Sequence, residues 1–119
     1  MDNPKIEWVQ KSGKNCLKFT FQESFKEQDA KAAIDKWREA LATRPPQERI
    51  VHIWDCLGMK DYDQSARTKW SETCKDLKDQ IDVIWVITNS LLIKMGATVI
   101  SVFTSLNIKV VSSEADIRL

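Results

Sequence analysis

Two short apolar segments constrain the fold of this chain more than any other feature. Residues 50–54 and 83–87 are runs of five residues, rich in β-branched side chains and free of Asp, Glu, Lys and Arg. Runs of this kind are typical of strands that are buried on both faces of a sheet. Apolar residues recur every three or four positions from Tyr62 to Ile81, which predicts one amphipathic helix between the two strands. The sequence therefore predicts neighbouring parallel strands at the centre of a sheet.

The flanking segments extend the same alternation of strands and helices. Residues 6–10 and 16–21 lie on either side of a turn-forming stretch, which predicts an antiparallel hairpin. A capping box at residues 24–27 predicts the start of a first helix, which we expect to end near Arg44, before Pro45 and Pro46.

The C-terminal third of the sequence adds one helix and one strand. Residues 91–105 form a broadly apolar helical segment whose Gly96 and Ala97 would allow close approach of a neighbouring backbone. A last strand is predicted at residues 108–111, followed by a short helix start at residues 112–116. The predicted fold class is α/β: residues 1–119 form a single domain whose mostly parallel sheet carries an antiparallel N-terminal hairpin strand and packs against helices.

Length and charge argue against several classes of partner. The chain has 119 residues, enough for one core, and its 18 basic and 17 acidic residues give a net charge of +1. With so little net field, we expect no binding to nucleic acid. The longest uncharged stretch in the second half, residues 95–108, is too short for a transmembrane helix. Residues 1–5 lack the basic start and apolar core of a secretory signal, so we expect a cytoplasmic protein.

Signatures of catalysis or of a cofactor are thin. Cys16, Cys56 and Cys74 form no C-x-x-C pair, and with one histidine they predict reduced, buried thiols and no metal site. The sequence contains no phosphate loop, dinucleotide-binding motif or hydrolase elbow, so we expect no cofactor and no enzymatic activity. His52 lies inside an apolar strand, where a hydrogen-bonded core histidine is expected. An enzyme built on Asp55, Asp63 or Cys56 is the alternative, although no base, nucleophile and orienting group can be placed together.

The carboxyl ends of the central strands are the first place to look for a site, because ligands of open parallel sheets bind there. These ends carry Trp54, Asp55 and Cys56 on one strand and Asn89 and Ser90 on the next. The structural alternative is that Asp55 binds loop amides and that Asn89 or Ser90 caps a helix. Of the five tryptophans, those at positions 37, 70 and 85 are predicted to lie in the core. Trp54 and the tryptophan at position 8 are candidates for a pocket or an interface.

The element order resembles the STAS domain, the module of bacterial anti-sigma factor antagonists and of sulphate transporter tails. In that family a central strand ends in Asp, a Gly follows three residues later, and Asp-Ser-Ser-Gly opens the next helix. The corresponding residues here are 55–58, Asp-Cys-Leu-Gly, and 63–66, Asp-Gln-Ser-Ala. Residues 108–117 also resemble the last strand and helix start of the family. The chain departs from the pattern at Gln64, at Ala66 and at 67–69, Arg-Thr-Lys, where the family has a small, apolar run.

The resemblance implies a non-enzymatic regulatory module that binds a protein partner, such as a kinase or another regulator, and is switched by phosphorylation of Ser65. Lys69 lies one turn further along that helix. The alternative is a small-molecule or lipid-binding domain with an apolar pocket, and an exposed face of residues 91–103 would instead favour a homodimer. The candidate partner- or ligand-binding residues are Trp54, Asp55, Cys56, Gly58, Asp63, Ser65, Lys69, Asn89 and Ser90.

Overall fold

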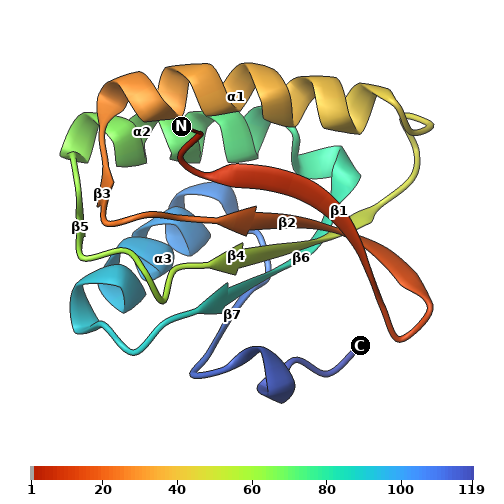
Figure 1. Cartoon of the computed structure of the whole chain (residues 1–119). Coiled ribbons are helices and arrows are strands. Elements are labelled where there is room, and N and C mark those ends of the chain that lie inside the picture. The colour runs from red at the N-terminus through yellow and green to blue at the C-terminus, as the bar shows by residue number, and fades with distance from the viewer. Residues whose placement is uncertain (1) are drawn as a thin grey trace.

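The computed structural model describes residues 2–119 (Figure 1). Its elements follow the predicted alternation, with two additional short strands and two 3-10 turns. In chain order they are β1 (Lys5–Lys11), β2 (Lys14–Thr20), β3 (Ser24–Phe25), α1 (Glu27–Ala42), β4 (Ile50–Asp55), β5 (Asp61–Tyr62), α2 (Gln64–Asp76), η1 (Lys78–Gln80), β6 (Ile81–Ile87), α3 (Leu91–Thr104), β7 (Ile108–Val111) and η2 (Glu114–Asp116).

A five-stranded sheet in the order β1-β2-β4-β6-β7 forms the framework of the domain. β1 and β2 are an antiparallel hairpin, and every other pair in this sheet is parallel. The two apolar runs that dominate the sequence are the neighbours β4 and β6, with Val51 opposite Val83 and Trp54 opposite Val86. The predicted α/β fold class, with a mostly parallel sheet and an antiparallel N-terminal hairpin, is therefore confirmed.

The three helices pack on one face of this sheet. Each connects neighbouring parallel strands, and successive right-handed crossovers in one direction place their helices on the same side. Trp37 of α1 and Trp70 of α2 lie 4.8 Å apart by ring centroids and both contact Phe19 of β2. The predicted core position of these two tryptophans is confirmed, since each is almost fully buried.

The opposite face of the sheet is covered by the C-terminal segment (Figure 1). Ile117 packs with Ile53, Trp85 and the other buried side chains of that face. Glu114 anchors the segment across the sheet through ion pairs with Lys18 at 2.8 Å and Lys11 at 3.4 Å. β4 and β6 are thus buried on both faces, but on this side the cover is a 3-10 turn and an extended tail.

The predicted bounds of two helices need correction. The helix expected from Tyr62 to Ile81 spans only Gln64–Asp76, because Tyr62 belongs to β5 and Ile81 begins β6. Both residues match the apolar spacing by coincidence, since a strand residue beside a helix also points into the core. The capping box expected at Ser24 is displaced too. Ser24 pairs with Asp61 in the small β3-β5 sheet, and the α1 cap is Lys26, whose amide donates to Asp29.

Within residues 2–119, no helix has the length and apolar character needed to cross a membrane.

Candidate functional site

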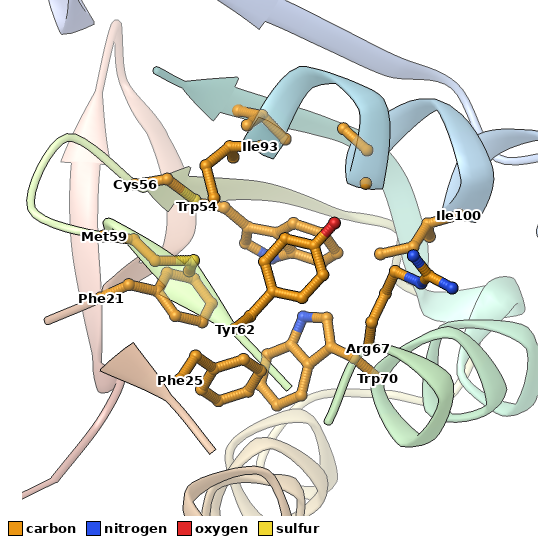
Figure 2. A pocket seen from close by; sticks show the side chains of 13 residues that line it. Phe21, Phe25, Trp54, Cys56, Met59, Tyr62, Arg67, Trp70, Ile93 and Ile100 are labelled. Atoms are coloured by element: carbon orange, nitrogen blue, oxygen red, sulfur yellow. The ribbon is translucent and has the colours of Figure 1, made fainter. Parts of the chain in front are cut away.

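A pocket opens between α2 and α3, beside the carboxyl end of β4 (Figure 2). Its free volume is about 50 Å³. The walls are aromatic and aliphatic side chains that come from strands, loops and both helices. The lining residues are Phe21, Phe25, Trp54, Cys56, Met59, Tyr62, Arg67, Trp70, Val86, Ile93, Gly96, Ala97 and Ile100.

Aromatic rings form the inner wall of the pocket. Phe21, Phe25 and Trp70 meet edge to face, with ring centroids 5.1–5.8 Å apart, and Trp54 contacts Trp70 at 6.1 Å. Trp54 and Trp70 are only 3% and 2% exposed. Within residues 2–119, neither indole N–H has a hydrogen-bond partner. The pocket wall therefore contains two buried donors without an acceptor.

Tyr62 and Gly96 bring β5 and α3 together at the edge of the pocket. A Cβ atom at Gly96 would lie 2.7 Å from the Tyr62 hydroxyl oxygen, so the ring approaches α3 at a point where only glycine leaves room. The same hydroxyl is 3.5 Å from the Leu92 carbonyl oxygen, the long limit of a hydrogen bond. The sequence predicts a neighbouring backbone at Gly96, but the neighbour is the Tyr62 side chain.

Arg67 is the one charged side chain in the pocket lining. It extends from the first turn of α2 and is half-buried, and Figure 2 shows its guanidinium beside Ile100 at the rim. Among the residues that the structure describes, it has no carboxylate at ion-pair distance. Arg38 and Arg44 are paired with acids, whereas Arg67 has no such pair among residues 2–119 and is therefore available to an anion from outside.

The pocket contains two of the residues that the sequence analysis placed at the strand ends, Trp54 and Cys56. The neighbouring Asp55 accepts a hydrogen bond from the Leu57 amide at 3.1 Å, which makes a turn in the loop after β4. Ser90 accepts from the Ile93 amide and caps α3. These contacts are the structural alternative that the sequence analysis describes for the strand ends.

Two further predicted positions at this edge lie on the surface. Asn89 and Gly58 are both exposed, one before α3 and the other in the loop after β4. A Cβ atom at Gly58 would lie 3.1 Å from the Phe21 carbonyl oxygen, so this loop passes close to the end of β2.

The other predicted residues, Asp63, Ser65 and Lys69, lie outside the pocket lining, where α1 and α2 begin. Asp63 accepts a hydrogen bond from the Glu27 amide at 3.1 Å, which joins the two helix starts. Ser65 is exposed, and a hydrogen bond from its hydroxyl is the main cause that lowers the pKa of Glu27, followed by Lys31. The structure thus divides the predicted site residues between the pocket, the strand ends and this helix junction.

Most of the pocket lining was not predicted, because it depends on tertiary contacts. Phe25, Met59 and Tyr62 lie on loops and short strands whose packing partners no periodicity reveals. On α3, the spacing of Ile93, Ala97 and Ile100 does indicate a buried helix face, but the sequence does not show that the face borders a pocket.

Two of the thiols and the histidine are withdrawn from solvent. Burial raises the pKa values of the Cys56 and Cys74 thiols, and it lowers the pKa of His52 to about 4. His52 Nε2 accepts from the Trp37 indole at 3.1 Å, and Nδ1 lies 2.9 Å from the Ile50 carbonyl oxygen. The prediction of a hydrogen-bonded core histidine is confirmed. Among residues 2–119, no three His, Cys, Asp or Glu side chains are grouped so that they could hold a metal ion.

The outer face of α3 is a second prominent feature. Six large apolar side chains on it are between 45% and 78% exposed: Leu91, Leu92, Met95, Val99, Val102 and Phe103. At about 100° per residue they occupy one continuous arc of about 120° on the helix. We call this arc the α3 apolar face. Phe103, at one margin of the arc, lies under the Lys75 ammonium of α2, so the α3 apolar face borders α2 and the pocket side of the domain.

Comparison with solved structures identifies the fold. A protein of the DUF3478 family with a SpoIIAA-like fold, from Shewanella loihica PV-4, superposes with a TM-score of 0.80 at 16% sequence identity, over 98% of this chain and 91% of that chain. The SpoIIAA-like fold is the fold of STAS domains and anti-sigma factor antagonists, so the fold that the sequence resemblance implied is confirmed. No family model matches the sequence, and no curated protein matches it.

Proposed function

We propose that this chain is a non-enzymatic protein-interaction module of STAS-like fold, and that its contact surface is the α3 apolar face. The observation that carries the proposal is the exposure of six large apolar side chains on one side of a single helix. Isolated exposed apolar residues are normal on a soluble protein, but a continuous patch of this size is typical of an interaction surface. The occupant that we propose is a second copy of the chain.

The area of the face supports a homodimer. At about 150–200 Å² for a fully exposed large apolar residue, the six exposures sum to roughly 600 Å², the upper end of the largest apolar patch of an ordinary monomer. Two copies in an isologous contact would bury roughly 1,200 Å², the lower end of the range of stable specific interfaces. The arc itself contains no charged residue, and the cation at its margin is Lys75, whose ammonium lies over the Phe103 ring.

A non-enzymatic role is supported by the state of the reactive groups. A nucleophilic cysteine needs thiolate character and access, whereas the Cys56 and Cys74 thiols are buried and have raised pKa values. A general base at neutral pH needs a pKa near 7 and contact with substrate, whereas both ring nitrogens of His52 are engaged in the core.

Oligomeric state tests the proposed surface. Sedimentation equilibrium of the purified protein should give a mass near twice the 13.7 kDa of one chain. Val102→Glu, at the most exposed position of the α3 apolar face, should give 13.7 kDa because a dimer would bury the new carboxylate without a partner. Gln47→Glu is the matched control: it adds one negative charge at an exposed position in the loop between α1 and β4, away from α3, and should remain dimeric. A monomeric wild-type protein at about 100 μM, tens of times above the Kd of a micromolar contact, would refute the proposed dimer.

The regulatory part of the proposal concerns Ser65. Ser65 is near enough to Glu27 to lower the pKa of that carboxyl, so a phosphoryl group on this exposed hydroxyl would set two anions side by side where α1 and α2 begin. Lys69 of α2 is near enough to contribute to the lowered pKa of Glu27, and it offers the phosphate a cation. We propose that phosphorylation weakens the hydrogen bond between the Glu27 amide and Asp63 and so changes how a regulatory protein binds where α1 and α2 begin.

The junction can be tested without knowing the regulator. Ser65→Glu should accelerate amide hydrogen exchange at Glu27, whose amide is bonded to Asp63, whereas Ser65→Ala should change it less because no anion is added. Equal exchange in the two variants would show that charge at position 65 does not act on the junction. Mass spectrometry of the protein from its native cells would show whether Ser65 carries phosphate.

A further inference from the structure

Two indole N–H groups in the pocket wall have no acceptor. Trp54 and Trp70 are both more than nine-tenths buried, and neither Nε1 is hydrogen-bonded to residues 2–119. Figure 2 shows the nitrogen of Trp70 on the side of the ring that faces Tyr62 and Arg67, and the nitrogen of Trp54 behind Tyr62. A buried donor without a partner costs free energy. The Trp85 indole on the opposite face is also unpartnered, but the Trp54 and Trp70 donors both line one pocket, which an acceptor from a ligand can enter.

The polar groups of the lining define the charge of that ligand. They are the two indoles, the Cys56 thiol, the Tyr62 hydroxyl and the Arg67 guanidinium, all of which can donate hydrogen bonds. The lining, drawn from the residues that the structure describes, contains no carboxylate, and Arg67 has no ion-pair partner among them. Such a pocket favours a group that only accepts, and a guanidinium binds a carboxylate with good geometry.

The walls and the volume define the size of the ligand. Apart from these donors, the lining is aromatic and aliphatic, so the rest of the ligand must be apolar. The free volume of about 50 Å³ is small, but the pocket borders the surface at Tyr62, whose hydroxyl makes only a 3.5 Å contact with Leu92. A rotation of this ring would enlarge the opening at the cost of little hydrogen bonding.

We propose that this pocket binds a small apolar carboxylic acid, of the size of benzoate or a short-chain fatty acid, with its apolar body against the aromatic wall and its carboxylate held by Arg67 and the indole N–H groups. The proposal does not rest on the dimer, because α3 uses its inner residues Ile93, Ala97 and Ile100 for the pocket and its outer residues for the α3 apolar face.

Nuclear magnetic resonance of the indole N–H groups tests binding directly, with benzoate and hexanoate as the probes. Each of the five tryptophans gives one resolved indole signal, which single Trp→Phe variants assign. Titration should shift the signals of Trp54 and Trp70 in a saturable manner. The internal control is Trp85, whose indole is also buried and unpartnered but lies on the opposite face of the sheet, and whose signal should not move.

Substitutions then separate the two kinds of polar contact. Arg67→Met keeps an apolar stem and removes the charge, and it should weaken benzoate binding about tenfold or more. Benzamide, which has the same ring but no charge, should bind the wild-type protein more weakly than benzoate and should bind Arg67→Met about as well as it binds the wild type. Trp70→Phe should lower the affinity for benzoate several-fold. The matched Trp85→Phe should leave the affinity for benzoate unchanged within about twofold.

Three results would overturn the proposal. One is the absence of a saturable shift at Trp54 and Trp70 with either acid at about 50 mM, above the dissociation constant of roughly 10 mM that the usual binding free energy per heavy atom gives an acid of this size. The second is equal affinity for benzoate and benzamide in the wild-type protein. The third is benzoate binding that survives Arg67→Met unchanged. The dispersion of the amide spectrum shows whether each variant is folded. If Trp70→Phe does not fold, Arg67→Met, whose substitution lies at the rim of the pocket, still tests the proposal.

Discussion

His52 makes the stability of this protein depend on pH because its pKa differs between the folded and the unfolded chain. It is the single histidine of the chain and is fully buried between Trp37 and Ile50. Its Nε2 accepts from an indole N–H that cannot turn into an acceptor, so a second proton on the ring would replace a hydrogen bond with two opposed donors. Burial, which disfavours the charged ring, lowers the pKa of His52 from 6.5 to about 4 in the folded protein.

The sign and size of the effect follow from linkage. Between these two pKa values the unfolded chain binds a proton at His52 and the folded chain does not, so stability is complete above pH 6.5 and is lost as the pH falls toward 4. The loss approaches about 3 kcal/mol in total, of which about 2 kcal/mol falls between pH 7 and pH 5. Carboxylates titrate mainly near pH 4, at the lower end of this window, so the comparison is made between pH 7 and pH 5.

Denaturant unfolding at pH 7, 6 and 5, followed by tryptophan fluorescence, measures the effect. The comparison variant is His52→Gln, whose side-chain oxygen can accept from Trp37 but which binds no proton. The free energy of unfolding of the wild-type protein should fall by about 2 kcal/mol relative to that of the variant between pH 7 and pH 5. Parallel pH profiles of the two proteins would refute the reasoning, because they would show that His52 protonates equally in both states.

Three other predictions concern packing. Gly96→Ala would place a Cβ 2.7 Å from the Tyr62 hydroxyl and displace this ring, but alanine also gains about 1 kcal/mol of helix propensity. The net change in thermal unfolding should stay within about 1 kcal/mol and should become a gain when Tyr62→Ala is the background. Ile117→Ala should cost about 2–3 kcal/mol in urea unfolding because it uncovers the second face of the sheet; a loss near zero would show that the C-terminal segment adds no stability. Cys56 and Cys74 should react with an aromatic disulfide reagent only on unfolding, so fast labelling of the native protein would contradict their burial.

Local sequence patterns predicted most of the fold. The five main strands and three helices appear in the predicted order, because periodicity and β-branched runs report how often a side chain meets the core. Patterns were least informative where neighbouring elements share the same spacing. Tyr62 and Ile81 match the three- and four-residue spacing of the apolar side chains of α2, although they belong to strands. The strands β3 and β5 have only two residues each, which is too short for a pattern to predict them.

The candidate site was predicted only in part. Trp54 and Cys56 could be proposed from the sequence because the carboxyl end of a parallel strand is a place defined by topology. Ser65 and Asp63 follow the same loop, but the structure places them at the junction with Glu27 and outside the pocket lining. Their separation depends on how α1 and α2 begin beside each other, which no spacing within one segment records.

What the sequence by itself determined is the class of fold and the side of each element that faces the core, because both follow from short-range patterns of apolar and polar residues. What the tertiary structure alone decided is the pocket, the free Arg67 and the two indoles without acceptors, because each of these is defined by groups from distant segments. The α3 apolar face depends on both the sequence pattern and the tertiary packing. Its apolar composition is visible in the sequence, but only packing shows that Ile93 and Ile100 face inward and that Leu91 and Val102 are left exposed.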